Sequence, residues 1–106
     1  MSDTKRPPGP YSIGSDRWPG LSKLVEEMGE VQQVLGKLIA TGGESAHWDG
    51  TDLRQRLREE LSDLKAACVF FAQVNQLDAV TDIEREHRKI RQFHAWHAEQ
   101  RVKEGS

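Results

Sequence analysis

The chain has 106 residues, of which 36% are hydrophobic and 30% are charged, and it contains a single cysteine. This length allows one domain with a modest core, and one cysteine excludes a disulfide within the chain. A formal net charge of -2 excludes an overall basic surface for nucleic acid. No apolar run reaches the roughly 18 residues of a membrane span, and there is no signal peptide. We therefore expect a soluble, cytoplasmic protein that binds neither nucleic acid nor membrane.

Residues 1–17 are rich in proline and glycine, from Pro7 to Gly14. Because these residues break helices, the segment is predicted to be an extended or disordered arm. Packing of Tyr11 and Ile13 on a neighbouring subunit is the alternative to a free tail. The helical domain is then expected to cover residues 18–106.

The first helix is predicted to begin between Asp16 and Ser22 and to end near Ala40. Apolar residues recur there at helical spacing, Pro19 suits the first turn, and Asp16 is a candidate N-cap. The glycine pair at 42–43 favours left-handed backbone, which ends a helix.

A loop over residues 42–52 follows and contains His47 and Trp48. A tryptophan in a glycine-rich polar loop is either an anchor on the core or a stacking surface for a nucleobase. The anchor is the preferred interpretation for Trp48. Trp18, just before the first helix, has the same two interpretations.

The second helix is predicted from Thr51 or Asp52, both plausible N-caps, to about Gln76. Residues 66–72 are apolar almost all round, which indicates burial on several faces. Three helices of one small chain cannot easily cover such a segment, so it predicts a subunit interface. The predicted apolar stripe of this helix consists of Leu53, Leu57, Leu61, Leu64, Cys68 and Phe71. Cys68 on this stripe is interpreted as a small core residue, because no activating base is evident.

The third helix is predicted from about Asp78 to about Val102. Its expected inner stripe consists of Ile83, His87, Ile90, His94 and His97, with Phe93 and Trp96 extending it sideways. Its first half is basic, through Arg85, Arg88, Lys89 and Arg91. These cations fit a solvated face and a phosphate-binding face equally well.

Two acidic motifs lie on the first two predicted helices. One reads E-E-x-x-E over residues 26–30, and the other reads E-E-x-x-D over residues 59–63. Within each motif the second and last acids are three apart, so they project from nearly the same side of a helix. Glu27 falls on the edge of its apolar stripe and Glu60 within its stripe, where an unpaired carboxylate is costly.

Antiparallel packing of these helices would bring four acids together, namely Glu27, Glu30, Glu60 and Asp63. Like charges at this spacing repel each other, so two such helices indicate a shared cation. Carboxylates without a thiol cluster favour a hard ion, Mg²⁺, with Mn²⁺ as a substitute.

The two motifs, with Trp18-Pro19 and residues 21–24 (L-S-K-L) ahead of the first, resemble the MazG-like, all-α nucleoside triphosphate pyrophosphohydrolases. The similarity runs from about Trp18 to about Phe93. It implies Mg²⁺-dependent cleavage of a nucleoside triphosphate between the α and β phosphates, giving a monophosphate and pyrophosphate, in nucleotide-pool cleansing. It also implies that the catalytic metal ligands are Glu27, Glu30, Glu60 and Asp63.

The family carries a lysine or arginine and an asparagine on its last helix to hold phosphates. Arg85 and Lys89 stand four apart here, but no asparagine is present, which leaves the substrate preference open. The candidate phosphate ligands are Lys23, Arg85, Arg88 and Lys89, and the candidate base-binding residues are Trp18, His47 and Trp48. The resemblance favours a homotetramer over a homodimer.

The predicted fold is all-α, a bundle of long antiparallel helices completed by self-association. Two other functions are open. Amphipathic helices alone would suit a non-enzymatic oligomerisation or regulatory module, although such a scaffold gains nothing from acids at apolar positions. Glu84-x-x-His87 resembles half of a di-iron carboxylate site, whose second half only a twofold assembly could supply.

Overall fold

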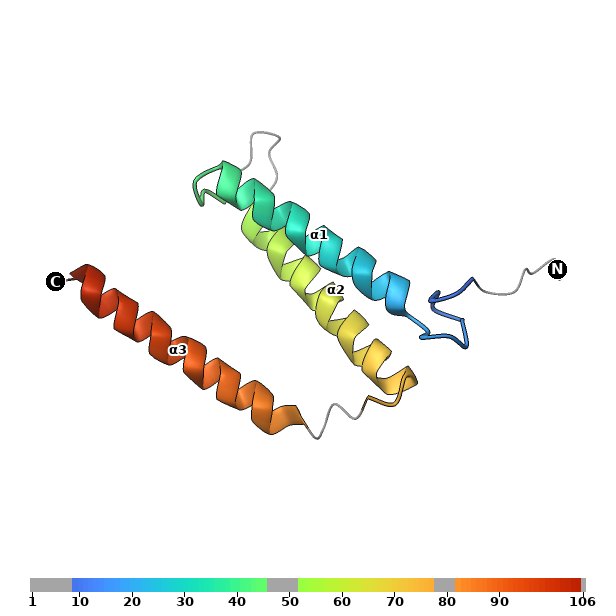
Figure 1. Ribbon diagram of the computed structural model, residues 1–106. Helices are drawn as coiled ribbons and strands as arrows, with labels where there is room; N and C mark the ends of the chain where they lie inside the picture. Colours follow the sequence, from blue (N-terminus) through green and yellow to red (C-terminus); the bar gives the residue numbers. More distant parts are fainter. Residues whose placement is uncertain (1–8, 46–51, 78–81, 106) are drawn as a thin grey trace.

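The computed structural model describes residues 9–45, 52–77 and 82–105, and this part of the chain forms three helices (Figure 1). Helix α1 spans Leu21–Ala40, α2 spans Leu53–Val74 and α3 spans Ile83–Gly105. The described residues contain no strand, so the all-α prediction is confirmed. The first two helices have the expected bounds within about two residues. Helix α3 begins at Ile83, and residues 78–81 of its predicted span lie outside the described residues.

The segment before α1 is folded into turns over its described residues, 9–20, rather than extended. The backbone N–H of Tyr11 donates to the carbonyl of Arg17 at 3.1 Å, and that of Ser22 donates to the carbonyl of Tyr11 at 2.9 Å. The buried Ser15 hydroxyl accepts a hydrogen bond from the N–H of Arg17 at 2.9 Å. The turned segment therefore lies against the start of α1; the rest of the predicted arm, residues 1–8, lies outside the described residues.

Gly20, not Asp16, occupies the N-cap position of α1, and no side chain caps this helix. Its φ of 85° is a left-handed conformation that favours glycine. The ring of Phe70 lies 3.0 Å from the position a Cβ atom would take. Both the backbone conformation and the close approach of α2 therefore require glycine at this point.

Helices α1 and α2 pack side by side and antiparallel (Figure 1). The buried apolar side chains of the described residues all belong to this pair: Val31, Val34, Leu53 and Ala67. The start of α2 has one of the predicted caps, since the Asp52 carboxylate accepts hydrogen bonds from the N–H groups of Arg54 and Gln55. Thr51 lies outside the described residues.

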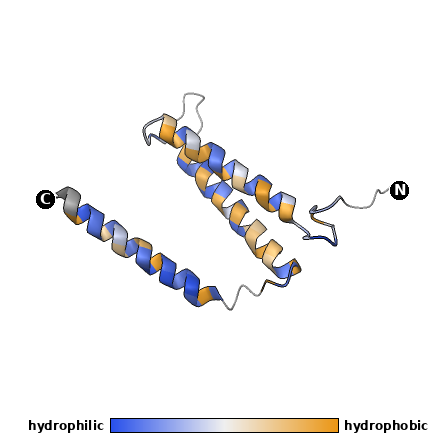
Figure 2. Ribbon diagram, viewed as in Figure 1, coloured by the Kyte–Doolittle hydropathy of each residue, from blue (hydrophilic) through white to orange (hydrophobic). Residues whose placement is uncertain are grey.

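The far end of the pair is closed by contacts between the turned segment and α2. The side-chain amide of Asn75 donates to the carbonyls of Pro19 and Phe71, both at 2.9 Å. The ring of Trp18 stacks on that of Phe71, with centroids 5.9 Å apart and planes 16° apart. The chain itself thus covers part of the apolar second half of α2, which Figure 2 shows in orange.

The face that α2 turns towards α1 differs from the predicted stripe. Leu61 is 48% exposed and Cys68 is also exposed, so neither belongs to the core of the single chain. The buried and half-buried residues at helical spacing are instead Leu53, Leu57, Glu60, Leu64, Ala67 and Phe71. Glu60 therefore lies in the middle of the packed face.

Helix α3 stands apart from the other two and forms an open V with α2 (Figure 1). No Cα atom of α3 lies within 8 Å of one in α1 or α2, although the start of α3 and Ala72 on α2 line a common open pocket. Every side chain described along α3 is exposed, including the predicted inner stripe. The radius of gyration is 18.7 Å, against about 13 Å for a compact chain of this length. None of the described helices is long and apolar enough to cross a membrane.

Candidate metal site

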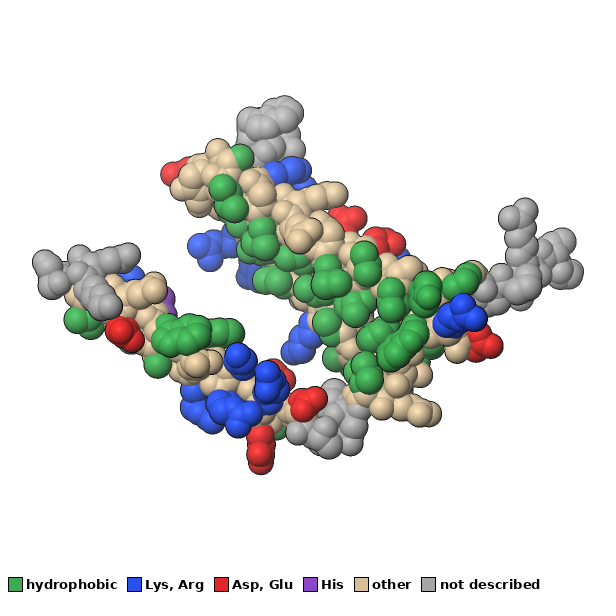
Figure 3. Space-filling model, in the orientation of Figure 1, with side chains coloured by type: hydrophobic (Ala, Val, Ile, Leu, Met, Phe, Trp, Pro, Cys, Tyr) green, Lys and Arg blue, Asp and Glu red, His purple; other side chains and the backbone are tan. Residues whose placement is uncertain are grey.

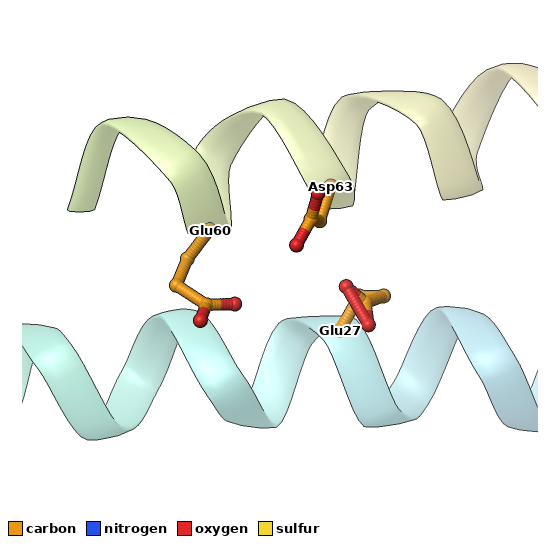
Figure 4. Close-up of side chains that lie close together, drawn as sticks. All are labelled: Glu27, Glu60 and Asp63. Carbon is orange, nitrogen blue, oxygen red and sulfur yellow. The ribbon is translucent and has the colours of Figure 1, made fainter. Parts of the chain in front are cut away.

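Three carboxylates converge between α1 and α2, with Glu27 reaching from one helix and Glu60 and Asp63 from the other (Figure 4). One oxygen from each lies within 4.8 Å of the other two. Glu27 and Glu60 are half-buried and Asp63 is exposed. The antiparallel packing inferred from the two motifs thus brings together three of the four predicted acids.

The donor set fits a small hard cation. Mg²⁺ binds oxygen at about 2.0–2.1 Å, so ligands on opposite sides of an octahedral ion are about 4.2 Å apart and adjacent ligands about 3 Å apart. Three oxygens within 4.8 Å of one another would therefore have to draw together by up to about 2 Å to bind one ion directly. Three carboxylates without sulfur or imidazole match the ligands that Mg²⁺ and Mn²⁺ prefer.

The environment of Glu60 opposes the ionisation of its carboxyl group. Partial burial raises the pKa of Glu60, and the charges of Glu30, Asp63 and Glu27 raise it further. Arg56, one turn earlier on α2, acts in the opposite direction and lowers it. Within the described part of the chain, no hydrogen bond or ion pair compensates Glu27, Glu60 or Asp63. A bound cation would supply that compensation.

Glu30 lies near the cluster without joining it. It is half-buried and close enough to raise the pKa of Glu60, but it is not one of the three converging ligands. The structure therefore places this predicted ligand on the edge of the site.

The candidate phosphate ligands are not brought to the carboxylates within one chain. Arg85, Arg88 and Lys89 lie on α3, whose Cα atoms are all more than 8 Å from those of the two helices that hold the cluster. Lys23 lies on α1, where its ammonium group pairs with Glu26 at 3.2 Å on the exposed surface. Only Lys23 shares a helix with a ligand of the cluster.

Trp18 is the one candidate base-binding residue among those described, because His47 and Trp48 lie outside them. Its stacking on Phe71 agrees with the anchor interpretation. Yet 48% of it is exposed, and with Asp16, Arg17 and Asn75 it lines an open surface pocket of about 520 Å³. This pocket adjoins Asn75, about 18 Å along α2 from Asp63.

Two residues that shape the site were not predicted from the sequence. Arg56 moderates the pKa of Glu60, and it could have been found from its position one turn before that acid. Asn75 fixes the end of the helix pair through the carbonyl of Pro19, 56 residues away in the chain. No local pattern signals a contact of that separation.

No family model, no curated protein and no solved structure matches the chain.

Proposed function

We propose that the chain is a Mg²⁺-dependent nucleoside triphosphate pyrophosphohydrolase of the MazG-like kind, acting in nucleotide-pool cleansing. The observation that carries the proposal is the convergence of Glu27, Glu60 and Asp63 from two helices. The resemblance of the paired acidic motifs to that family adds the substrate class and the bond that is cleaved.

In this proposal, Glu27, Glu60 and Asp63 would bind the ion between α1 and α2. Mg²⁺ bound there would neutralise charge on phosphate oxygens as the bond to pyrophosphate breaks. Glu30, on the edge of the cluster, is available to accept the proton of the attacking water. Arg85, Arg88 and Lys89 would bind the phosphate tail only when an α3 helix approaches the pair, and Lys23 could do so from α1.

Self-association is part of the proposal, with a homotetramer preferred to a homodimer. It is supported by apolar side chains that the single chain leaves in water, such as Phe93 and Trp96, which are 55% and 51% exposed. The same exposed surface also favours a second candidate, an oligomerisation module without catalytic activity. The two candidates differ in whether the acidic cluster binds an ion and supports turnover.

Product analysis separates these candidates. With a nucleoside triphosphate and Mg²⁺, we expect the monophosphate and pyrophosphate to appear in equal amounts, and EDTA to stop the reaction because the proposed ligands are carboxylates. A panel of canonical and modified nucleotides would identify the preferred base and sugar. Diphosphate with orthophosphate would place the cleavage at the terminal phosphate and contradict the proposal. No turnover, together with no thermal stabilisation by Mg²⁺, would favour the oligomerisation module.

A further inference from the structure

The single chain leaves two apolar stripes uncovered. One follows the α1–α2 pair and consists of Val25, Met28, Leu35 and Ile39 on α1 with Leu61 on α2. The other follows α3 and consists of Ile83, Ile90, Phe93 and Trp96. Figure 3 shows hydrophobic side chains gathered along the visible face of the pair and again midway along α3. We call these sets the pair stripe and the arm stripe.

The pair stripe and the exposed carboxylate of the cluster, Asp63, lie on different sides of the helix pair. At about 100° per residue, the four α1 members of the stripe fall within about 80° of one another. Glu27, which faces α2, is about 80° from the nearest of them, and Glu30 is about 140° away. On α2, Leu61 and Asp63 are about 160° apart. A helix packed on the pair stripe therefore leaves the side of the pair that carries Glu30 and Asp63 open to solvent and substrate.

The two stripes have the same length. Val25 and Ile39 are 14 residues apart, which is about 21 Å along a helix, and Ile83 and Trp96 are 13 residues apart, which is about 20 Å. The arm stripe winds through about 140° around α3 from Ile83 to Trp96, whereas the α1 members of the pair stripe stay within about 80°. The arm stripe therefore matches the pair stripe in length and is the broader of the two.

The exposed apolar area of the two stripes is large enough for a stable dimer interface if both stripes are covered in both copies. The nine side chains are each between 42% and 81% exposed, and at on the order of 100 Å² each they offer about 900 Å² per copy. Two copies would then bury roughly 1,800 Å², within the usual range for specific interfaces. Pairing the two pair stripes alone would bury roughly half of that and leave both arms in water.

We propose that two copies of this chain exchange their third helices, so that the arm stripe of each copy packs on the pair stripe of the other. Each copy offers one arm and one docking surface, so a twofold arrangement satisfies all four stripes and closes the assembly. The detached position of α3 and the radius of gyration of 18.7 Å agree with an arm that reaches beyond its own chain. Larger assemblies would then be built from this dimer.

The native Cys68 allows a direct test, because it is exposed on α2 one heptad after Leu61, on the side of the pair stripe. A second cysteine is introduced into the full-length chain at one arm-stripe position at a time: Ile83→Cys, Ile90→Cys, Phe93→Cys or Trp96→Cys. After mild oxidation, non-reducing electrophoresis should show a species of twice the 12.0 kDa chain mass for at least one of these variants. Ala95→Cys, on the opposite side of α3, is the matched control and should remain at the mass of one chain.

Adding Cys68→Ser to each variant should abolish the covalent dimer, which excludes a bond between two α3 helices. A disulfide formed within one chain would show that α3 folds back onto its own pair and would overturn the exchange. Failure of all four variants to crosslink, with their helical circular dichroism retained, would overturn the docking surface itself. Because the readout needs no turnover, it is independent of whether the proposed hydrolysis is observed.

Discussion

Glu60 connects the packing of the helices with the chemistry of the candidate site. Its position in the middle of the face that α2 turns to α1 places a carboxylate where an apolar residue would stabilise the pair. The sequence predicted this position from helical periodicity, because residues 57, 60 and 64 share one side of a helix. Periodicity could not show that Glu30 falls outside the cluster, since that depends on the rotation of α1 against α2.

Replacing this carboxylate tests the site directly. Glu60→Gln removes a charge with little change in volume, so we expect the helices to persist and turnover to fall by on the order of 10²-fold or more. The apo protein should become slightly more stable, because repulsion from Glu27 and Asp63 is relieved. Glu59→Gln, on the outward face, is the matched control. Wild-type kcat/KM in Glu60→Gln would exclude Glu60 as a ligand.

The raised pKa of Glu60 also predicts how stability responds to pH. Partial burial and the neighbouring acids make the folded protein bind a proton at Glu60 more tightly than the unfolded chain does. As pH falls from neutral through the raised pKa, the metal-free protein should therefore gain stability relative to Glu60→Gln, until the unfolded chain is protonated too. Urea unfolding of both proteins between about pH 7 and pH 4 measures this difference. If the free energies of unfolding of the two proteins differed by the same amount across that range, Glu60 would not have the raised pKa assigned to it.

At the scale of the elements, local rules predicted α1 and α2 well and the segment before them poorly. Hydrophobic spacing and the Asp52 cap gave bounds close to those observed. The turned segment at 9–20 depends instead on backbone hydrogen bonds such as that from Gly20 to Ser12, which no periodic pattern indicates. The prolines and glycines predicted a break in the helix correctly, but not the turns that form there.

Replacing Asn75 tests whether its hydrogen bond to Pro19 holds the turned segment against α2. Asn75→Ala removes two hydrogen bonds and leaves the carbonyl of Pro19 without this donor, so we expect a loss of about 1–3 kcal/mol in the free energy of unfolding. Gln73→Ala, an exposed change two residues away, should cost less than about 0.5 kcal/mol. Urea titration followed by circular dichroism distinguishes them. Equal effects would show that Asn75 does not hold the segment.

For the whole molecule, the sequence identified an apolar stripe on α3 but not what covers it. Periodicity shows that one side of a helix is apolar, whereas the partner of that side is decided by packing between elements or chains. The bundle expected from three long helices is therefore only partly formed, by α1 and α2. Ile90 and Phe93 are both exposed in the single chain, and the proposed exchange of α3 would cover them with a second copy.

The contact between Asn75 and Pro19 has a consequence for ion selectivity. Helices α1 and α2 are consecutive in the chain, so one end of the pair is joined covalently, and the Asn75 side chain fastens the other end to the start of α1. The hydrogen bond resists separation of the two helices at this end and so limits widening of the gap between Glu27 and Glu60. Ca²⁺ binds oxygen at about 2.3–2.6 Å, farther than the 2.0–2.1 Å of Mg²⁺, and would need a wider arrangement of the same carboxylates. In the proposed metal site, a hydrogen bond about 18 Å from the cluster would thereby favour ions of the size of Mg²⁺.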